Sequence, residues 1–380
     1  MRYSLIDATV LAPTGPGPGA VHVSAGLICA QPAAQAARIS LPGCTVLPGI
    51  IDAHGDGFER HMAPRRGAMR DLAQGLSATE AELAANGITT AMLAQFWSWE
   101  GGMRAPEFAQ RLLGAHKTYA SRGTDMRVQL RFETHLLDDY TAFAQCVQDY
   151  GVGQVVFNDH LPHAALAAGK RPPRLTGQAL KSGRSPEAHL ALLQALSAQS
   201  ARVPAQLAQL AARLAAGGVI LGSHDDASPQ TRAQWRAMGV GLCEFPETHA
   251  AAQAARHGGD GIVLGAPNVV RGGSHSGNVS AQDLAEAGLC DALASDYHYP
   301  APRQAALQLA PQLGLAAAWA LVSTGPARLL GLHDRGQIAP GLRADLVVLD
   351  ARGDVCLTVA GGLPTYATGQ GAAALLAARG

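Results

Sequence analysis

The sequence predicts an α/β protein: a (β/α)8 barrel of the TIM type with a small β-sandwich domain formed from both termini. Three observations support this fold. Eight apolar segments of strand length alternate with helical segments in the middle of the chain, most of these strands are followed by His, Asp or Glu, and both ends of the chain are rich in short β segments. Continuous apolar strands separated by helices form parallel sheets buried on both faces, so eight of them predict a barrel.

Three segments follow from these patterns. Residues 1–46 alternate short β-rich pieces with Gly/Pro turns and contain no convincing helix. Residues 336–380 return to a β pattern. We expect these two segments to form one small β domain and residues 47–335 to form the barrel.

The elements of the barrel can be placed in order. The predicted strands are 44–54, 87–95, 127–134, 153–159, 218–224, 240–245, 261–267 and 291–296. Among the helices between them, Ser77 and Glu80 have the spacing of a capping box, and Gly87 is placed to end that helix in the left-handed conformation. Pro204 is expected to divide the helical stretch 186–216 into two helices.

The composition narrows the function. The 380 residues carry 29 basic and 29 acidic side chains, so no excess of charge suggests nucleic acid as a partner. No run of 18 apolar residues suggests a membrane span, and the first residues lack the apolar core of a signal peptide. The six cysteines are scattered singly and have no Cys-x-x-Cys spacing. We expect a cytoplasmic homo-oligomer, a dimer, that acts on a small molecule.

Polar side chains follow five of the eight predicted strands. Catalytic residues of such barrels lie at the carboxyl ends of strands. The residues found there are His54 and Asp56, then Glu133 and His135, Asp159 and His160, His224 and Asp225, and Asp296. A single His at a strand end is more often structural than a ligand, but five coincident ends indicate one metal site. Imidazole and carboxylate donors suit zinc, manganese or iron(II).

The lysine content restricts how two metals could be bridged. Only three of the 29 basic residues are lysines: Lys117 falls in a predicted helix, and Lys170 and Lys181 fall in a loop. A carboxylated lysine at a strand end is therefore not expected. Glu133 is the natural substitute, because a carboxylate can bridge or cap metal ions.

Several motifs together resemble a known superfamily. The combination of His54-x-Asp56 after Pro-Gly-Ile-Ile-Asp, His224, Asp296 and the tail motif Gly-x-x-Ala-Asp-Leu-Val resembles the amidohydrolase superfamily. The segments Ser223–Ala227, Glu244–Thr248, Gly265–Val279 and Ser295–Tyr297 resemble the PhnM family of phosphonate degradation, which comprises α-D-ribose 1-methylphosphonate 5-triphosphate diphosphatases. The resemblance covers nearly the whole chain.

The resemblance implies a fold, a reaction and a set of site residues. It implies an amidohydrolase-type barrel that releases pyrophosphate from the triphosphate with metal-activated water. The implied cofactor is one or two divalent metal ions, zinc first, with manganese or iron as alternatives. The implied metal ligands are His54, Asp56, Glu133, His160, His224 and Asp296, of which Asp296 and His224 are also catalytic. Asp296 would bind the attacking water or accept its proton.

The first motif departs from the family pattern. The family usually has His-Thr-Asp followed by Asn or His, whereas this chain has His54-Gly55-Asp56-Gly57. We expect the smaller residues to leave the metals in place and to reshape the pocket wall. Asp56 also stands where many members of the superfamily carry a second histidine, so it either binds a metal or orients the water.

Two segments are candidates for phosphate binding. Segment 161–186 carries Lys170, Arg171, Arg174 and two further cations and no acidic residue, so it could fold over a triphosphate or could be a solvated loop. After the seventh strand, Arg271 lies in a glycine-containing run in which backbone N–H groups can approach an anion. The candidate substrate contacts in this region are Asn268, Arg271, Ser274 and His275, with His135 and Asp225 as further candidates.

Two other functions fit the same pattern. A metal hydroxide attacks a carbonyl carbon as well as a phosphorus atom, so an amidohydrolase acting on a C–N bond, such as a deacetylase or cyclic amidase, is the main alternative. The other is a catalytically silent scaffold, which would be expected to lack some of the strand-end donors. All of the expected donors are present.

Overall fold

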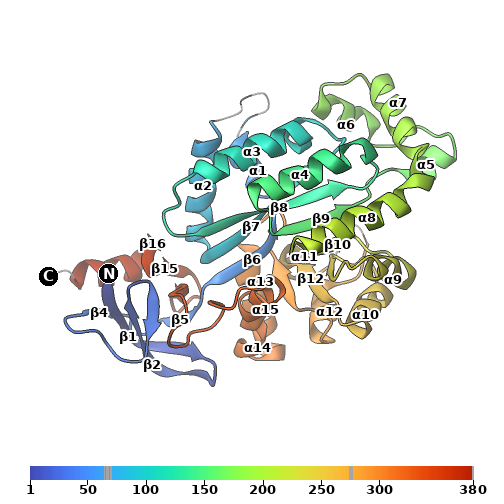
Figure 1. Ribbon diagram of the computed structural model, residues 1–380. Coiled ribbons are helices and arrows are strands. Elements are labelled where there is room, and N and C mark those ends of the chain that lie inside the picture. The colour runs from blue at the N-terminus through green and yellow to red at the C-terminus, as the bar shows by residue number, and fades with distance from the viewer. Residues whose placement is uncertain (64, 66–67, 69–70, 274–276, 379–380) are drawn as a thin grey trace. The chain divides into compact units, whose positions relative to one another are not determined.

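The computed structural model describes residues 1–63, 65, 68, 71–273 and 277–378. The chain forms two compact units. The first unit contains residues 1–93, 120–127 and 262–380, and the second contains residues 94–119 and 128–261. Figure 1 shows the order of the elements along the chain. Of the predicted site residues, Ser274 and His275 lie outside the described part of the chain.

Eight parallel strands form the barrel sheet, which confirms the predicted (β/α)8 fold. The sheet has the order β13-β12-β11-β10-β9-β8-β7-β6. Its strands are β6 (Ile50–Gly55), β7 (Ile88–Trp97), β8 (Asp125–Glu133), β9 (Gln154–Asn158), β10 (Ile220–His224), β11 (Leu242–Glu244), β12 (Gly261–Gly265) and β13 (Ala292–Ala294). A parallel bridge between Gly55 and Asp296 brings the last strand beside the first, so the barrel is nearly closed.

The prediction of one continuous first strand over 44–54 was wrong. Segment 44–54 is two strands, because the chain breaks between β5 (Thr45–Pro48) and β6. Strand β5 pairs with the terminal sheet through β1 and β14, and Gly49 N–H donates to the Asp345 carbonyl at 2.8 Å. The Pro-Gly pair is therefore the point at which the chain leaves one sheet and enters the other.

Both ends of the chain build the second sheet, as predicted. Its order is β16-β15-β14-β5-β1-β2-β3, with β4 beside β1. Its remaining strands are β1 (Arg2–Ala12), β2 (Gly15–Ser24), β3 (Leu27–Cys29), β4 (Ala37–Ser40), β14 (Leu346–Leu349), β15 (Val355–Ala360) and β16 (Leu363–Ala367). Strand β1 runs parallel to β4 and β5, and the other neighbours are antiparallel. In Figure 1 the N-terminal strands lie beside β15, β16 and helix α16 (Gly369–Ala377), which the sequence pattern did not indicate.

The first unit contains helices whose ends can be compared with the predicted caps. They are α1 (Glu59–Met62), α2 (Leu72–Ala85), α11 (Ala266–Arg271), α12 (Ala281–Glu286), α13 (Ala301–Leu313), α14 (Leu315–Ala320), α15 (Thr324–Leu329) and α16. Helix α2 is capped by Asp71, whose carboxylate accepts from the N–H groups of Ala73 and Gln74, so the capping box at Ser77 was wrong. Gly87, at φ +77°, follows the helix in the left-handed conformation, as predicted.

The helices of the second unit pack in part against a buried aromatic cluster. They are α3 (Pro106–Thr118), α4 (Tyr140–Tyr150), α5 (His163–Ala167), α6 (Leu175–Ser182), α7 (Pro186–Ser197), α8 (Val203–Ala216), α9 (Pro229–Ala237) and α10 (His249–His257). Pro204 lies in the first turn of α8, which confirms the division of 186–216 into two helices. Phe132, Phe143 and Phe157 belong to one buried cluster, and Figure 1 shows α4 and α8 alongside β8 and β9.

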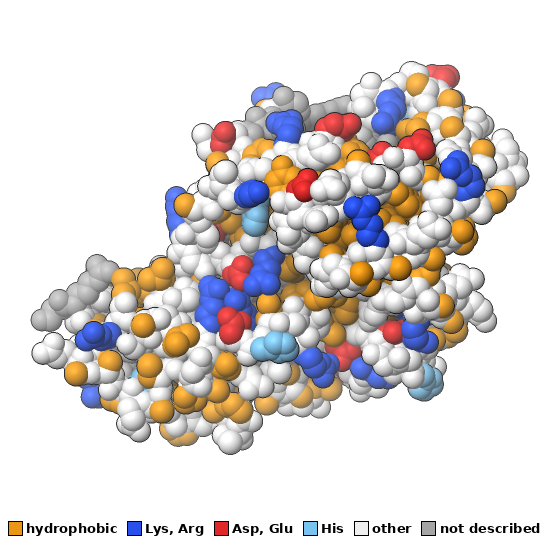
Figure 2. Space-filling view, in the orientation of Figure 1, with side chains coloured by type: hydrophobic (Ala, Val, Ile, Leu, Met, Phe, Trp, Pro, Cys, Tyr) orange, Lys and Arg blue, Asp and Glu red, His pale blue; other side chains and the backbone are white. Residues whose placement is uncertain are grey.

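Segment 161–186 is not a loop. It contains α5 and α6, and Leu161 and Leu175 are buried in a cluster with Trp99, Leu193 and Leu196. Lys181 accordingly lies in a helix. Among the described residues, no helix is both long and apolar enough to cross a membrane. Figure 2 shows basic and acidic side chains interspersed on the visible face.

Candidate active site

A carboxylate and an imidazole from adjacent strands meet in the second unit. Glu133 is the last residue of β8, and His160 follows β9, which pairs with β8 in parallel. The Glu133 carboxylate lies 2.5 Å from His160 Nδ1 and accepts from the His160 backbone N–H at 3.1 Å. Trp99 Nε1 donates to the same carboxylate at 3.3 Å. Glu133 is completely buried, so these contacts fix its orientation.

This pair has the donor set of a metal site. Donor atoms of Glu100, Glu133 and His160 all lie within 4.8 Å of one another. Burial by itself would raise the pKa of Glu133, but the neighbouring His160 outweighs it and holds the pKa below its usual value. Burial opposes protonation of His160, but Glu133 outweighs burial and raises its pKa. Oxygen and nitrogen donors of this kind suit zinc, manganese or iron(II).

His224, at the end of β10, faces a cation and a buried acid. Arg131 Nη2 lies 2.9 Å from His224 Nε2, and the Glu244 carboxylate lies 3.5 Å from His224 Nδ1. An arginine only donates, so Nε2 presents its lone pair to a positive charge, as it would to a metal ion. Gln129 Nε2 donates to Glu244 at 2.8 Å. The Asp225 carboxylate is 3.6 Å from His224 Nε2.

The first unit holds the other predicted ligands. His54 is fully buried near the end of β6, and Asp56 follows this strand. The Asp296 N–H donates to the His54 carbonyl at 3.0 Å, and the Asp56 N–H donates to the Asp296 carbonyl at 2.8 Å. The backbone therefore holds these three residues at the junction of the first and last strands.

A buried carboxylate supports this junction. Asp52 accepts from Ser295 Oγ at 2.5 Å and from the Ser295 N–H at 2.8 Å. Burial raises the pKa of Asp52 to about 6, although the hydrogen bonds from Ser295 oppose this. The sequence analysis gave neither residue a role in the site, because Asp52 is enclosed within a strand rather than placed at its end.

The structure gives a reason for the two glycines of the first motif. A Cβ atom at Gly55 would lie 2.6 Å from Asp52 Oδ2, 2.7 Å from Ser295 Oγ and 3.1 Å from the Tyr299 ring. A Cβ atom at Gly57 would lie 3.3 Å from the same ring. At Gly55 the Asp52 and Ser295 oxygens are the nearest obstacles, and at Gly57 Arg60 Nη1 is nearest at 3.2 Å; the buried Tyr299 ring adjoins both positions.

Three strand ends carry backbone strain. Asp225, Phe245 and Asp296 have φ values of 59°, 54° and 54°. Asp225 and Phe245 directly follow β10 and β11, and Asp296 is the second residue after β13. Side chains other than glycine rarely adopt this left-handed region, and such strain is concentrated at functional sites. Two of these residues are ones that the sequence had placed among the candidate site residues.

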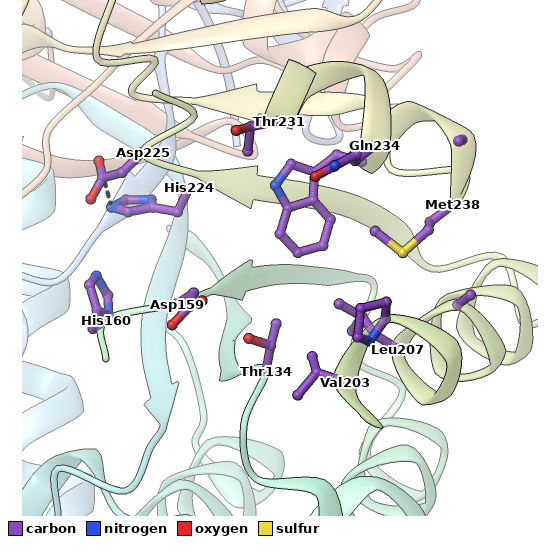
Figure 3. A pocket seen from close by; sticks show the side chains of 14 residues that line it. Thr134, Asp159, His160, Val203, Leu207, His224, Asp225, Thr231, Gln234 and Met238 are labelled. Atoms are coloured by element: carbon purple, nitrogen blue, oxygen red, sulfur yellow. Dashed lines mark ion pairs between the residues drawn. The ribbon is translucent and has the colours of Figure 1, made fainter. Parts of the chain in front are cut away.

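A pocket of about 570 Å³ opens beside His160 and His224 in the second unit. Figure 3 shows these two imidazoles with Asp159 and Asp225 on one side, and Leu207 and Met238 on the other. The described residues that line it are Thr134, Asp159, His160, Val203, Pro204, Leu207, Ala208, His224, Asp225, Thr231, Gln234, Trp235, Ala237 and Met238. No Lys or Arg is among these described lining residues, and the far wall is apolar.

The residues predicted to bind phosphate differ in their contacts and exposure. Asn268 holds its own segment, because its side chain donates to the Val279 carbonyl at 3.3 Å and accepts from the Ala281 N–H at 3.0 Å. Arg271 is exposed in the last turn of α11. Arg171 is exposed and lies 3.8 Å from Glu187.

The other basic residues of this segment also face solvent. Lys170 is exposed in the segment between α5 and α6, and Arg174 is exposed at the N-cap of α6. The described contacts do not join either residue to Glu133 or His160. Their role in phosphate binding stays a prediction.

One buried acid was missed. Glu244 ends β11 and is completely buried against Gln129 and His224. The rule that identified the other donors would have found it, because Glu244 lies at the end of a predicted strand, 240–245. Arg131, in the middle of β8, gave no such signal.

Comparison with solved structures confirms the fold. N-acetyl-D-glucosamine-6-phosphate deacetylase from Mycobacterium smegmatis has a TM-score of 0.64 and 16% identity, covering 97% of this chain and 100% of that chain. The corresponding deacetylase from Pasteurella multocida has a TM-score of 0.64 and 13% identity over the same shares. No established family profile matches the sequence. The fold is therefore a (β/α)8 barrel whose strand ends carry imidazole and carboxylate donors, the arrangement of a candidate metal site.

The sequence comparison is more specific than the fold. The chain is 34% identical over 320 residues to α-D-ribose 1-methylphosphonate 5-triphosphate diphosphatase from Escherichia coli strain K12. The match covers 80% of this chain and 83% of the relative. The chain belongs to the family of that diphosphatase, the PhnM family, as the sequence motifs indicated.

Proposed function

We propose that this enzyme hydrolyses α-D-ribose 1-methylphosphonate 5-triphosphate, or a close triphosphate, to the 5-phosphate and pyrophosphate. The observation that carries the proposal is the 34% identity to the E. coli diphosphatase over most of both chains. The run from Gly265 to Val279, together with the Ser295-Asp296-Tyr297 motif, supports the same family function.

The proposed metal ligands are His54, Asp56, Glu133, His160, His224 and Asp296. Each lies at or just beyond the carboxyl end of a strand of the parallel sheet, except His54, which is the last but one residue of β6. A bound divalent ion would lower the pKa of a water molecule toward neutrality and so supply hydroxide. Zinc is the proposed ion, because nitrogen and carboxylate donors accommodate it well.

The chain's own residues have distinct proposed roles. Asp296 would accept the proton of the attacking water, and its backbone is fixed by the hydrogen bonds to His54 and Asp56. His224 would act through the metal ion that it helps to hold, with its Nδ1 facing Glu244. Arg271 and the basic residues Lys170, Arg171 and Arg174 would offset the charge of the leaving pyrophosphate.

The direct test is product analysis. The purified enzyme, supplied with zinc or manganese, should release pyrophosphate from α-D-ribose 1-methylphosphonate 5-triphosphate, and chelation should abolish the release. Release of orthophosphate instead, or full activity after removal of the metal, would contradict the proposal. Nucleoside triphosphates serve as a comparison for the specificity toward the ribose phosphonate.

A second candidate function is hydrolysis of a C–N bond. The specific observation in its favour is the pocket beside His160 and His224, whose described lining holds no Lys or Arg and ends in an apolar wall. Such a wall suits an uncharged group better than a polyphosphate. Assay of N-acetylated amino sugars and of dipeptides in parallel with the triphosphate would distinguish the two functions.

A further inference from the structure

A second group of metal-binding side chains lies outside the proposed catalytic set. His135 follows β8, Asp159 follows β9, and His163 begins α5. One donor atom from each of the three lies within 4.8 Å of the other two. His163 Nε2 lies 2.8 Å from the Asp159 carboxylate, and His135 Nδ1 lies 3.5 Å from it. All three residues belong to the second unit.

Ser200 determines which ring nitrogen of His135 carries the hydrogen in the neutral imidazole. Ser200 Oγ donates to the Ser197 carbonyl at 2.7 Å, so it must accept from His135 Nε2, which lies 3.1 Å away. In the neutral imidazole the hydrogen is then on Nε2, and Nδ1 carries a lone pair. Metal-ligating histidines are commonly oriented by such a hydrogen bond from the other ring nitrogen.

This tautomer places two acceptors against each other. The Nδ1 lone pair of His135 lies 3.5 Å from Asp159 Oδ1, an oxygen that also accepts from the Leu161 N–H at 3.2 Å and lies 2.9 Å from His163 Nε2. Thr134 Oγ1 lies 3.4 Å from this nitrogen and makes at most a long hydrogen bond. A cation between the imidazole and the carboxylate would turn this repulsion into attraction.

We propose that His135, Asp159 and His163 form a separate site for a divalent transition-metal ion, with zinc as the ion bound. Two imidazoles and one carboxylate are a common protein ligand set for such ions, and they leave positions open for water or an anionic oxygen. The His163 side chain is 47% exposed, which gives the ion a path from solvent, whereas the His135 side chain is 4% exposed and holds its ring in place.

The open positions suggest a ligand for the bound ion. Asp159 also lines the pocket beside His160 and His224, and Figure 3 shows its side chain at this wall. An ion on Asp159 would add a positive charge to a pocket whose described lining has no Lys or Arg. It would therefore attract an anionic oxygen of a pocket ligand. The site does not depend on the proposed triphosphate reaction.

Zinc stoichiometry tests the site without any use of activity. The metal-free full-length protein would be dialysed against buffered zinc, and bound zinc per chain would be measured by mass spectrometry. His163→Ala should bind one zinc ion fewer per chain than the wild type, or should bind that ion more than about 100-fold more weakly. Loss of a group that only orients a ligand typically weakens metal binding by about 10- to 100-fold, and loss of the ligand itself should weaken it more. His257→Ala, which removes an exposed histidine of the same unit, should match the wild type. Equal zinc binding by His163→Ala and the wild type would overturn the proposal.

A second measurement uses the unaltered protein, so it is independent of any folding defect in a variant. Anomalous diffraction at the zinc edge should show a peak about 2.0–2.1 Å from His135 Nδ1 and from His163 Nε2. Zinc at Glu133 and His160 with no peak between His135 and His163 would overturn the second site and leave the catalytic proposal standing. A peak between His135 and His163 with no zinc at Glu133 and His160 would support the second site and contradict the proposed catalytic site.

Discussion

The Asp296 backbone N–H donates to the His54 carbonyl at 3.0 Å, which joins the second residue after the last barrel strand to the first strand. The Asp296 carbonyl in turn accepts from the Asp56 N–H at 2.8 Å. These bonds use only backbone atoms, so a change to the Asp296 side chain should leave the junction intact. This separates the proposed chemical role of Asp296 from its structural role.

We therefore expect Asp296→Asn to lower kcat by about 100- to 10,000-fold, the usual effect of losing a general acid or base. The melting temperature should change little, because the amide preserves the size of the side chain. Steady-state kinetics and thermal unfolding would test both expectations. Asp283→Asn, at an exposed position in α12, is the matched control, and similar kcat values for the two variants would contradict the role of Asp296.

The pKa of Asp52 predicts a pH-dependent contribution to stability. Burial raises this pKa from its ordinary value of 3.8 to about 6 in the folded protein. Protonated Asp52 therefore favours the folded state. This contribution to the free energy of unfolding is fully present below the pKa of Asp52 in the unfolded chain, and it is lost as the pH rises through the pKa in the folded protein. The shift corresponds to roughly 3 kcal/mol.

Asp52→Asn should remove this dependence, because an amide does not ionise in this range. The difference in unfolding free energy, wild type minus Asp52→Asn, should fall by roughly 3 kcal/mol between about pH 4 and about pH 7. Urea denaturation of the chelator-treated proteins would measure it. A difference that stays constant over this interval would show that Asp52 has an ordinary pKa.

The barrel strands could be predicted because burial on both faces gives a simple signal, a continuous apolar run. The same signal could not separate β5 from β6, since both strands are buried and only Gly49 lies between them. The capping box at Ser77 failed for a local reason. Asp71, six residues before Ser77, caps the helix, and Glu80 instead accepts from Ser121 Oγ and the Arg122 N–H.

The strand-end rule brought Glu133 and His160 into the candidate set, and their contact follows from the pairing of β8 with β9. It could not reveal Arg131 beside His224, because the direction of a side chain within a fully buried strand depends on the packing of the whole sheet. The tautomer of His135 could not be predicted from the sequence either. It depends on Ser200, which is 65 residues away in sequence.

A buried arginine stabilises the second unit. Arg232 is completely buried, and its guanidinium lies 3.1 Å from both the Asp226 and Asp260 carboxylates and 2.8 Å from Ser223 Oγ. Removal of the guanidinium would leave the buried Asp226 carboxylate without its cation, whereas Asp260 would keep its ion pair with Arg236. Such a loss typically costs about 3–5 kcal/mol.

Arg232→Met should therefore lower the free energy of unfolding by about 3–5 kcal/mol, although the methionine fills much of the space. Arg213→Met, at an exposed position in α8, should change it by less than about 0.5 kcal/mol. Denaturant titration followed by circular dichroism would measure both. Equal stabilities of the two variants would show that the buried ion pairs contribute no net stability.

The basic residues of segment 161–186 provide a test that separates the two candidate reactions. The segment is anchored by its apolar side chains and by Arg184, whose guanidinium donates to the Trp99 carbonyl at 2.7 Å. Lys170, Arg171 and Arg174 are exposed, so their replacement by glutamine should leave the segment folded. The triple variant should raise KM for the triphosphate by about tenfold or more, because charge-assisted hydrogen bonds to phosphate are lost.

The same variant should leave hydrolysis of an uncharged amide unchanged, because that substrate has no anion for the segment to bind. The double variant Arg202→Gln, Arg213→Gln removes exposed charges at α8 and its approach and serves as the control for general electrostatic effects. KM values at two salt concentrations would be compared, because screening should reduce the effect of the triple variant. If the triple variant and the control have the wild-type KM for the triphosphate, the segment is a solvated surface and the leaving pyrophosphate is bound elsewhere.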